Sequence, residues 1–126
     1  MTTTATTTTR VAVISVPVSD QDRARRFYVD QLGFDLIRDD DSIPGMRWVQ
    51  VRPKGSPTSL TLVDWFESMP AGSLRGLVFG VEDLAGDYER LVANDVEFVS
   101  PPRRQPWGTE AVVRDPDGNE FVFQQS

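Results

Sequence analysis

The chain contains no cysteine and no histidine. The lack of cysteine excludes disulfides, thiolate catalysis and zinc–thiolate sites. Without histidine as well, only an all-oxygen metal site of the kind that magnesium or calcium prefers remains possible. Basic residues are outnumbered 13 to 19, which gives a formal net charge of −6. Nucleic-acid binding depends on a concentrated basic face, so this charge argues against it, and the pair Arg103-Arg104 is too small to change that.

Long apolar runs are missing too. No segment approaches the roughly 20 consecutive apolar residues that a membrane-spanning helix needs, so no membrane partner is expected. Residues 1–9 lack the basic start and apolar core of a signal peptide, and their threonine-rich sequence predicts a disordered tail. A cytoplasmic protein with one domain over residues 10–126 is therefore expected.

The sequence contains an internal repeat. Val16-Pro17-Val18-Ser19-Asp20 and Phe79-Gly80-Val81-Glu82-Asp83 each lead from an apolar strand into an acidic helix cap, 63 positions apart (81 minus 18). The repeats, residues 10–66 and 74–126, predict an α+β fold of two βαβββ units. With the helices on one face of each sheet, two curled mixed sheets should face each other across a cleft, as a half-open barrel with helices outside.

Local patterns place the elements. The first repeat predicts a strand at 10–18 that is buried on both sides, a helix capped by Ser19 with Asp22 and ended by Gly33, strands at 34–38, 46–51 and 59–65, and a polar turn at 39–42. The second repeat predicts a strand at 77–81, a helix at 84–93, strands at 96–100, 110–114 and 120–124, and a loop at 101–108. The linker between the repeats is expected at 66–73.

Several of these segments together resemble the vicinal oxygen chelate superfamily, which includes glyoxalase, bleomycin-resistance and extradiol-dioxygenase proteins. They are Val18-Ser19-Asp20, Leu32-Gly33-Phe34, Phe79 to Leu84, Pro106-Trp107-Gly108 and Asp115-Pro116-Asp117-Gly118-Asn119. Each segment alone is weak evidence, since Asp-Pro-Asp-Gly-Asn is also simply a good turn. Their order and the coverage from about residue 10 to the end support the resemblance.

Enzymes of that superfamily bind a divalent metal with four side chains, and the resemblance places those positions on Val13, Thr61, Gly76 and Val122. Two of these residues lack a donor atom, glycine has no side chain, and a lone threonine hydroxyl is a poor ligand. A one-residue shift would point each side chain to the other face of its sheet. Neither a metal nor another cofactor is therefore expected.

Strand alternation predicts which side chains line the cleft. Ile14, Leu60, Leu62, Leu77, Phe79, Phe121 and Phe123 should face the helices. The other face should be apolar, with Ala111 and Val113 pointing inward and with aromatic edges. Such a cleft suits a hydrophobic or aromatic small molecule. The candidate ligand-binding residues are Arg47, Trp48, Gln50, Thr61, Trp65, Phe66, Trp107, Val113 and Val122.

Two functions remain open from the sequence. The resemblance to bleomycin-resistance proteins implies a homodimer whose grooves sequester a hydrophobic or aromatic antibiotic or natural product without a metal. The alternative is a metal-independent cyclase, isomerase or lyase of secondary metabolism, for which Asp64, Glu110 and Glu120 are the candidate bases. The sequence does not identify the ligand, and it leaves open whether the repeats pair within or between chains.

Overall fold

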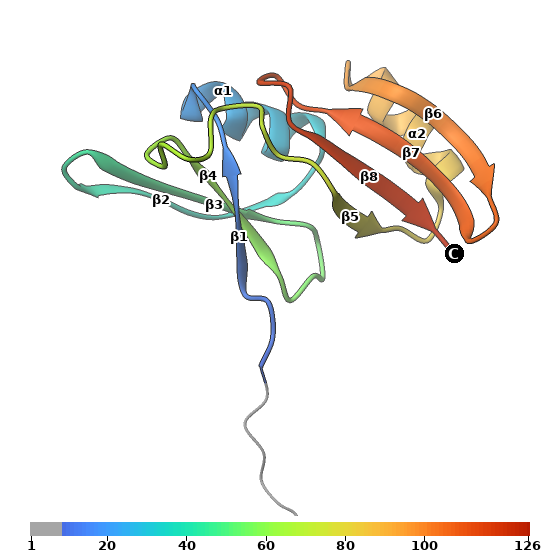
Figure 1. Cartoon of the computed structure of the whole chain (residues 1–126), viewed down its shortest axis with the longest axis horizontal. Coiled ribbons are helices and arrows are strands. Elements are labelled where there is room, and N and C mark those ends of the chain that lie inside the picture. The colour runs from blue at the N-terminus through green and yellow to red at the C-terminus, as the bar shows by residue number, and fades with distance from the viewer. Residues whose placement is uncertain (1–8) are drawn as a thin grey trace, which may run out of the picture.

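The computed structural model describes residues 9–126 and contains two βαβββ halves (Figure 1). The first half comprises β1 (Val13–Pro17), α1 (Gln21–Arg25), the π-helical segment η1 (Arg26–Gln31), β2 (Asp35–Ile43), β3 (Met46–Arg52) and β4 (Ser59–Val63). The second half comprises β5 (Leu77–Gly80), α2 (Leu84–Ala93), β6 (Glu97–Gln105), β7 (Gly108–Arg114) and β8 (Glu120–Gln125). The predicted fold class and its repeats are confirmed. The expected tail, apart from Thr9, lies outside the described residues.

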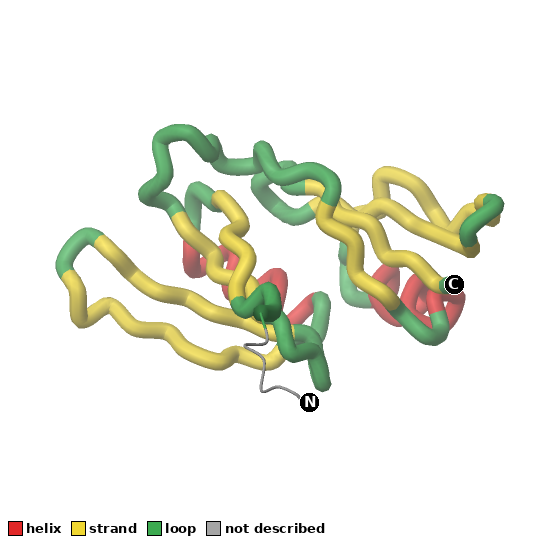
Figure 2. The backbone as a smooth tube through the Cα atoms, turned by 60° about the horizontal axis from the view of Figure 1, so that its bottom comes forward, coloured by secondary structure: helices red, strands yellow, loops and turns green. Residues whose placement is uncertain are grey.

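Each half builds one mixed sheet. The strand orders are β1-β4-β3-β2 and β5-β8-β7-β6, with the first strand of each half parallel to the last. Among the described residues no strand pairing joins the two sheets, and Figures 1 and 2 show the sheets side by side. The predicted cleft between two facing sheets is therefore not formed within one chain. β1 and β5 each remain an unpaired edge.

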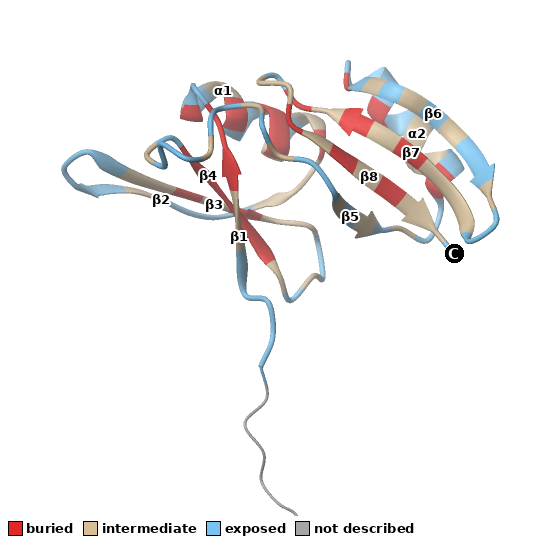
Figure 3. Ribbon diagram, in the orientation of Figure 1, coloured by how far each residue is buried: buried red, intermediate tan, exposed pale blue. Residues whose placement is uncertain are grey.

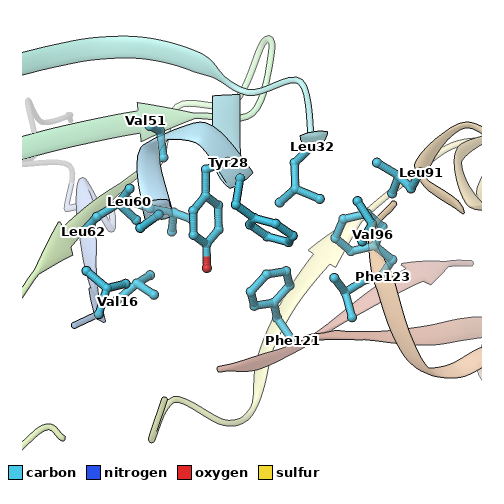
Figure 4. Close-up of a cluster of buried hydrophobic side chains, with 14 of the residues drawn as sticks. Val16, Tyr28, Leu32, Val51, Leu60, Leu62, Leu91, Val96, Phe121 and Phe123 are labelled. Atoms are coloured by element: carbon cyan, nitrogen blue, oxygen red, sulfur yellow. The ribbon is translucent and has the colours of Figure 1, made fainter. Parts of the chain in front are cut away.

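The two halves share one hydrophobic core (Figure 4). The ring of Tyr28 on η1 lies 6.0 Å from that of Phe121 on β8, measured between centroids, and Phe34 lies 5.7 Å from Phe79. Val16, Leu60 and Leu62 of the first sheet belong to the same cluster. The first helix therefore packs against both sheets, and the predicted helix-facing residues Leu60, Leu62, Phe121 and Phe123 are confirmed in the core.

A buried polar network also joins the halves. The Tyr28 hydroxyl donates to Asp115 Oδ2 over 2.8 Å, and Asn119 Nδ2 donates to the same oxygen and to the Pro17 carbonyl, each over 2.8 Å. Asn119 Oδ1 accepts from the backbone N–H of Leu74. We call Tyr28, Asp115 and Asn119, with the backbone groups of Pro17 and Leu74, the inter-half network. It fixes the Asp-Pro-Asp-Gly-Asn turn against the first half.

The network predicts a stability change in alkali. Burial, followed by the nearby Asp115 carboxylate, raises the pKa of the Tyr28 hydroxyl well above its usual value. An unfolded tyrosine ionises near pH 10, whereas folded Tyr28 stays protonated there. The unfolding free energy should therefore be intact below about pH 10 and fall above it by up to about 1.4 kcal/mol per pH unit from this residue. In urea unfolding between pH 8 and 11, the free energy of unfolding of Tyr28→Phe should decline less steeply with pH than that of the wild type. An unchanged slope would contradict this, and Tyr88→Phe is the control.

Two predicted loops are parts of edge strands. The expected polar turn at 39–42 lies inside β2, which runs to Ile43, because Asp39 is held by ion pairs with Arg47 and Arg25. The expected loop at 101–108 is mostly β6, although it contains Pro101 and Pro102. β6 is an edge strand, and the prolines fall where its pairing with β7 shifts register, so their missing N–H groups remove no ladder bond.

The start of the first half also differs from expectation. The cap of α1 is Asp20, whose carboxylate accepts from the Arg23 N–H, and Ser19 instead donates its hydroxyl to Asp117. β1 is not buried on both sides, because it is an edge strand and Val13 is 38% exposed; Figure 3 shows that only part of the strand is buried. Gly33 adopts a φ of +82°, so the predicted left-handed helix end is confirmed.

Candidate functional site

The face of the first sheet that the helices leave uncovered follows from its register. Gln50 pairs with Thr61 and Thr61 with Ser15, so these side chains share one face, opposite the core residues Leu60 and Leu62. The hydroxyl oxygens of Ser15 and Thr61 lie 3.4 Å apart. Thr61 is only 1% exposed, so a ligand reaches it only after neighbouring side chains move.

An aromatic cluster stands on this face. Trp48 on β3 and Trp65 after β4 stack with centroids 6.5 Å apart and an interplanar angle of 25°, and Phe66 lies 6.1 Å from Trp65. Trp48 Nε1 donates to Gln50 Oε1 over 2.9 Å, which orients the indole. Phe66 is exposed and the two tryptophans are half-buried. The structure thus brings four predicted ligand residues together, and we call Trp48, Trp65 and Phe66 the aromatic cluster.

The second sheet also presents an uncovered face. Val78, Val122 and Val112 form one row across β5, β8 and β7, and Glu110 and Gln124 pair in the next row. Trp107 in the β6–β7 turn is 56% exposed and donates from Nε1 to Glu110 over 3.2 Å. Val122 and Trp107 therefore belong to an apolar and aromatic surface, but on a different sheet from the aromatic cluster.

The prediction that Ala111 and Val113 point into the cleft is wrong. Val113 pairs with Phe121 and Ala111 with Phe123, and all of them lie in the core. Val112 takes the uncovered position instead. Three consecutive apolar residues, Ala111-Val112-Val113, carry no alternation from which the sequence could assign a side, so the register was ambiguous there.

Arg47 is also placed away from the uncovered face. Its guanidinium donates to both oxygens of Asp39 over 2.9 Å and to Asp22 on α1 over 2.6 Å, on the helix-covered side. The hydrogen bond from Arg47 holds the pKa of the Asp39 carboxyl below its usual value. The paired Arg47 therefore ties β3 to α1 and does not lie beside the aromatic cluster.

The candidate catalytic carboxylates do not converge. Asp64 is exposed beyond the end of β4, whereas Glu110 and Glu120 lie on the second sheet. Glu120 accepts from Arg114 over 3.0 Å, and Arg114 also donates to Glu97 over 2.8 Å. Glu110 accepts from the indole of Trp107. The arrangement at Glu120 is an ion-pair row across a sheet, which stabilises the strand pairing.

The positions that the superfamily resemblance assigns to metal ligands fall on both sheets. Val13 and Thr61 lie on the uncovered face of the first sheet, and Val122 lies on that of the second, with Gly76 just before β5. Within residues 9–126, no group of three or more acidic, histidine or cysteine side chains is arranged to hold a metal ion. These residues do not fit a divalent metal because they offer a single hydroxyl as donor.

A further cavity lies away from these residues. It has a volume of about 580 Å³ and opens at the seam between the halves, with Ile14, Leu60, Phe79 and Phe123 in its wall. None of the predicted ligand-binding residues lines it.

No helix within residues 9–126 is long and apolar enough to cross a membrane.

Comparison with known proteins assigns the family. The sequence profile of the Glyoxalase/Bleomycin resistance protein/Dioxygenase superfamily matches residues 10–123. The chain belongs to this superfamily. Its members thus include a chain in which valine, threonine and glycine occupy the positions expected for metal ligands.

Two solved structures and one sequence relative are similar to this chain over nearly their full length. TnmS3, an antibiotic binding protein from Streptomyces sp. CB03234, is 47% identical, with 96% of this chain and 98% of that chain covered and a TM-score of 0.89. A glyoxalase/bleomycin resistance protein from the same strain is 49% identical, with 92% and 100% covered and a TM-score of 0.84. YetH of Bacillus subtilis is 34% identical over 92% of this chain and 98% of its own length.

Proposed function

We propose that this superfamily member is a metal-free binding protein that sequesters a hydrophobic, aromatic antibiotic or natural product. The observation that carries the proposal is the aromatic cluster on the uncovered face of the first sheet. Stacked indoles with a nearby exposed phenylalanine offer large, rigid apolar area to a planar ligand, and Gln50 provides a polar group to orient it. The similarity to TnmS3, which is described as an antibiotic binding protein, supports the same function.

The proposal includes a homodimer with paired grooves. The aromatic cluster and the Trp107–Val122 surface lie on different sheets that do not face each other within one chain. A second copy, related by a two-fold axis, brings the first sheet of one protomer opposite the second sheet of its partner. Such an interface is supported by the unpaired edges of β1 and β5, since exposed strand edges favour pairing. It is also supported by the exposed side chains of Val13 on β1 and Val78 on β5.

Binding to a panel of compounds tests the function. Doxorubicin is the planar aromatic polyketide, bleomycin is the hydrophilic comparison, and thermal unfolding with and without 1 mM EDTA is the measurement. Doxorubicin at a hundredfold excess over its dissociation constant should stabilise the fold by about 2.7 kcal/mol, whether or not EDTA is present. No stabilisation by any planar aromatic antibiotic, or binding that EDTA abolishes, would refute the proposal.

The same mixtures distinguish a binder from an enzyme. A sequestering protein returns the compound unchanged, so chromatography of the extracted ligand should show no new product. Product formation that is lost in Glu110→Gln or Asp64→Asn would favour the metal-independent cyclase, isomerase or lyase instead.

A further inference from the structure

We propose that Arg52 binds an anionic group of the ligand, such as a carboxylate, beside the aromatic cluster. This inference rests on the proposed binding function and names the chemical class of the ligand, an acidic planar aromatic compound. It comes from a half-buried guanidinium that lies on the same face of the first sheet as Trp48 and has no protein partner within residues 9–126.

The position of Arg52 follows from the alternation of side chains along β3. Trp48, Gln50 and Arg52 point to the uncovered face of the first sheet. Val49 and Val51 point to the other face and lie in the core. Trp48 and Arg52 are four residues apart, so their Cα atoms are separated by about 13 Å along the strand. A three-ring aromatic compound with an acid group at one end can therefore stack on the aromatic cluster and reach Arg52.

Arg52 lacks the kind of partner that other half-buried arginines of the chain have. Arg23, Arg47 and Arg114 each form an ion pair with an aspartate or a glutamate. Within residues 9–126 the Arg52 side chain makes neither an ion pair nor a hydrogen bond, and its Nε is buried without a partner. A buried N–H without an acceptor is unfavourable. An anionic oxygen of a ligand would satisfy the guanidinium and neutralise its charge.

The carboxylates that the register places on the same face of β2 bind other groups. Asp35 lies opposite Arg52 in the sheet, but the two described side chains form no ion pair, and Asp35 Oδ1 accepts from Lys54 Nζ over 2.6 Å. Farther along β2, Asp40 Oδ1 accepts from the backbone N–H of Ser42 over 2.9 Å. Arg52 therefore keeps an uncompensated positive charge on the uncovered face.

The proposed homodimer leaves this face to the ligand, because the face forms one wall of the groove. The other wall is the uncovered face of the second sheet, whose carboxylates have donors of their own. Glu120 accepts from Arg114 over 3.0 Å, and Glu110 accepts from the indole of Trp107 over 3.2 Å. Arg52 should therefore contribute to ligand binding and not to the contact between subunits.

Three anthracene derivatives that differ in a single substituent test the charge preference. They carry a carboxylate, a hydroxymethyl group or an aminomethyl group at the same ring position, so one is anionic, one neutral and one cationic near neutral pH. Fluorescence titration measures their affinities. The carboxylate should bind about tenfold more tightly than the alcohol, since a hydrogen bond to a charged group contributes more than one between neutral groups. The ammonium compound should bind most weakly.

Arg52→Gln should remove the preference. The affinity for the carboxylate should fall about tenfold, and the affinity for the alcohol should change less than twofold. Arg26→Gln is the matched control, because it removes the same charge from an exposed position on η1, on the helix side of the first sheet. It should leave all three affinities unchanged. Sedimentation should show the same oligomeric state for Arg52→Gln and the wild type.

The outcomes separate this inference from the proposed function. Equal affinity for the carboxylate and the alcohol, or an Arg52→Gln variant that keeps the preference, would overturn the role of Arg52 and leave aromatic binding in place. A changed oligomeric state of Arg52→Gln would overturn it too, because Arg52 would then belong to a subunit contact. If no anthracene binds although doxorubicin does, this inference alone fails. If doxorubicin also does not bind, both fail.

Discussion

Trp48→Ala should weaken the binding of a planar aromatic antibiotic by about 30-fold, because a stacked tryptophan at the centre of a binding surface commonly contributes about 2 kcal/mol. In this protein the substitution removes one partner of the Trp48–Trp65 stack and the donor to Gln50. Both losses fall on the uncovered face, so the fold should be retained. Calorimetric titration of the compound that gives the largest thermal stabilisation measures the change.

The matched control is Ile43→Ala. Ile43 is 60% exposed at the end of β2, so its truncation removes apolar surface outside the aromatic cluster. It should change affinity less than twofold. A Trp48→Ala variant that binds within threefold of the wild type would remove the aromatic cluster from the proposed site.

Mixed dimers extend this test to the paired grooves. If each groove takes Trp48 from one protomer and Trp107 from its partner, Trp48→Ala and Trp107→Ala homodimers are both defective. A heterodimer purified through two different tags then has one intact groove and one groove with both changes. Recovery of wild-type affinity at reduced stoichiometry supports shared grooves, whereas a heterodimer that stays weak places both tryptophans in the same chain's site.

Asn119→Ala should lower the unfolding free energy by about 3 kcal/mol, since the loss of one buried polar group leaves several partners unsatisfied. Asn119 is fully buried, and its side chain bonds to Pro17, Asp115 and Leu74. After the substitution the Pro17 carbonyl and the Leu74 N–H lose these bonds inside the protein. Urea unfolding monitored by circular dichroism measures the effect.

Asn94→Ala is the control for this substitution. Asn94 also bonds across the structure, with its side-chain amide donating to the Gln31 carbonyl over 3.2 Å, but it is exposed at the end of α2. Water replaces that bond, so the loss should stay below about 1 kcal/mol. Equal destabilisation by Asn94→Ala and Asn119→Ala would show that burial of the inter-half network is not the source of its strength.

Much of the fold could be predicted from the repeat and from alternation. β4 and β8 place Leu60, Leu62, Phe121 and Phe123 toward the core, as their period-two patterns indicate. Alternation failed at Ala111-Val112-Val113, where every residue is apolar. It also failed to reveal how far β2 and β6 extend, because Asp39 and Pro101 are poor strand formers and are accommodated by ion pairing or by an edge position.

The candidate site could be predicted only in part. The grouping of Trp48, Trp65 and Gln50 follows from strand neighbours close in sequence. The separation of Trp107 from Trp48 depends on how the halves pack, which is set by contacts such as Tyr28 with Asp115, 87 residues apart. No local pattern encodes such a pairing. The cavity at the seam could not be predicted for the same reason, because its wall combines residues from both halves, such as Ile14 and Phe79.

The inter-half network and the cavity at the seam lie toward opposite ends of β1, the network at Pro17 and the cavity at Val11 and Ile14. One end of the boundary between the sheets is therefore cross-linked by buried hydrogen bonds, and the other is left unfilled. A rotation of one half about the fixed end would change the spread of the open end without breaking a strand pairing, and it would displace contacts between the halves such as Phe34 with Phe79. We therefore expect substitutions at the open end to change the mutual angle of the two sheets, and with it the width of any groove that they share with a partner.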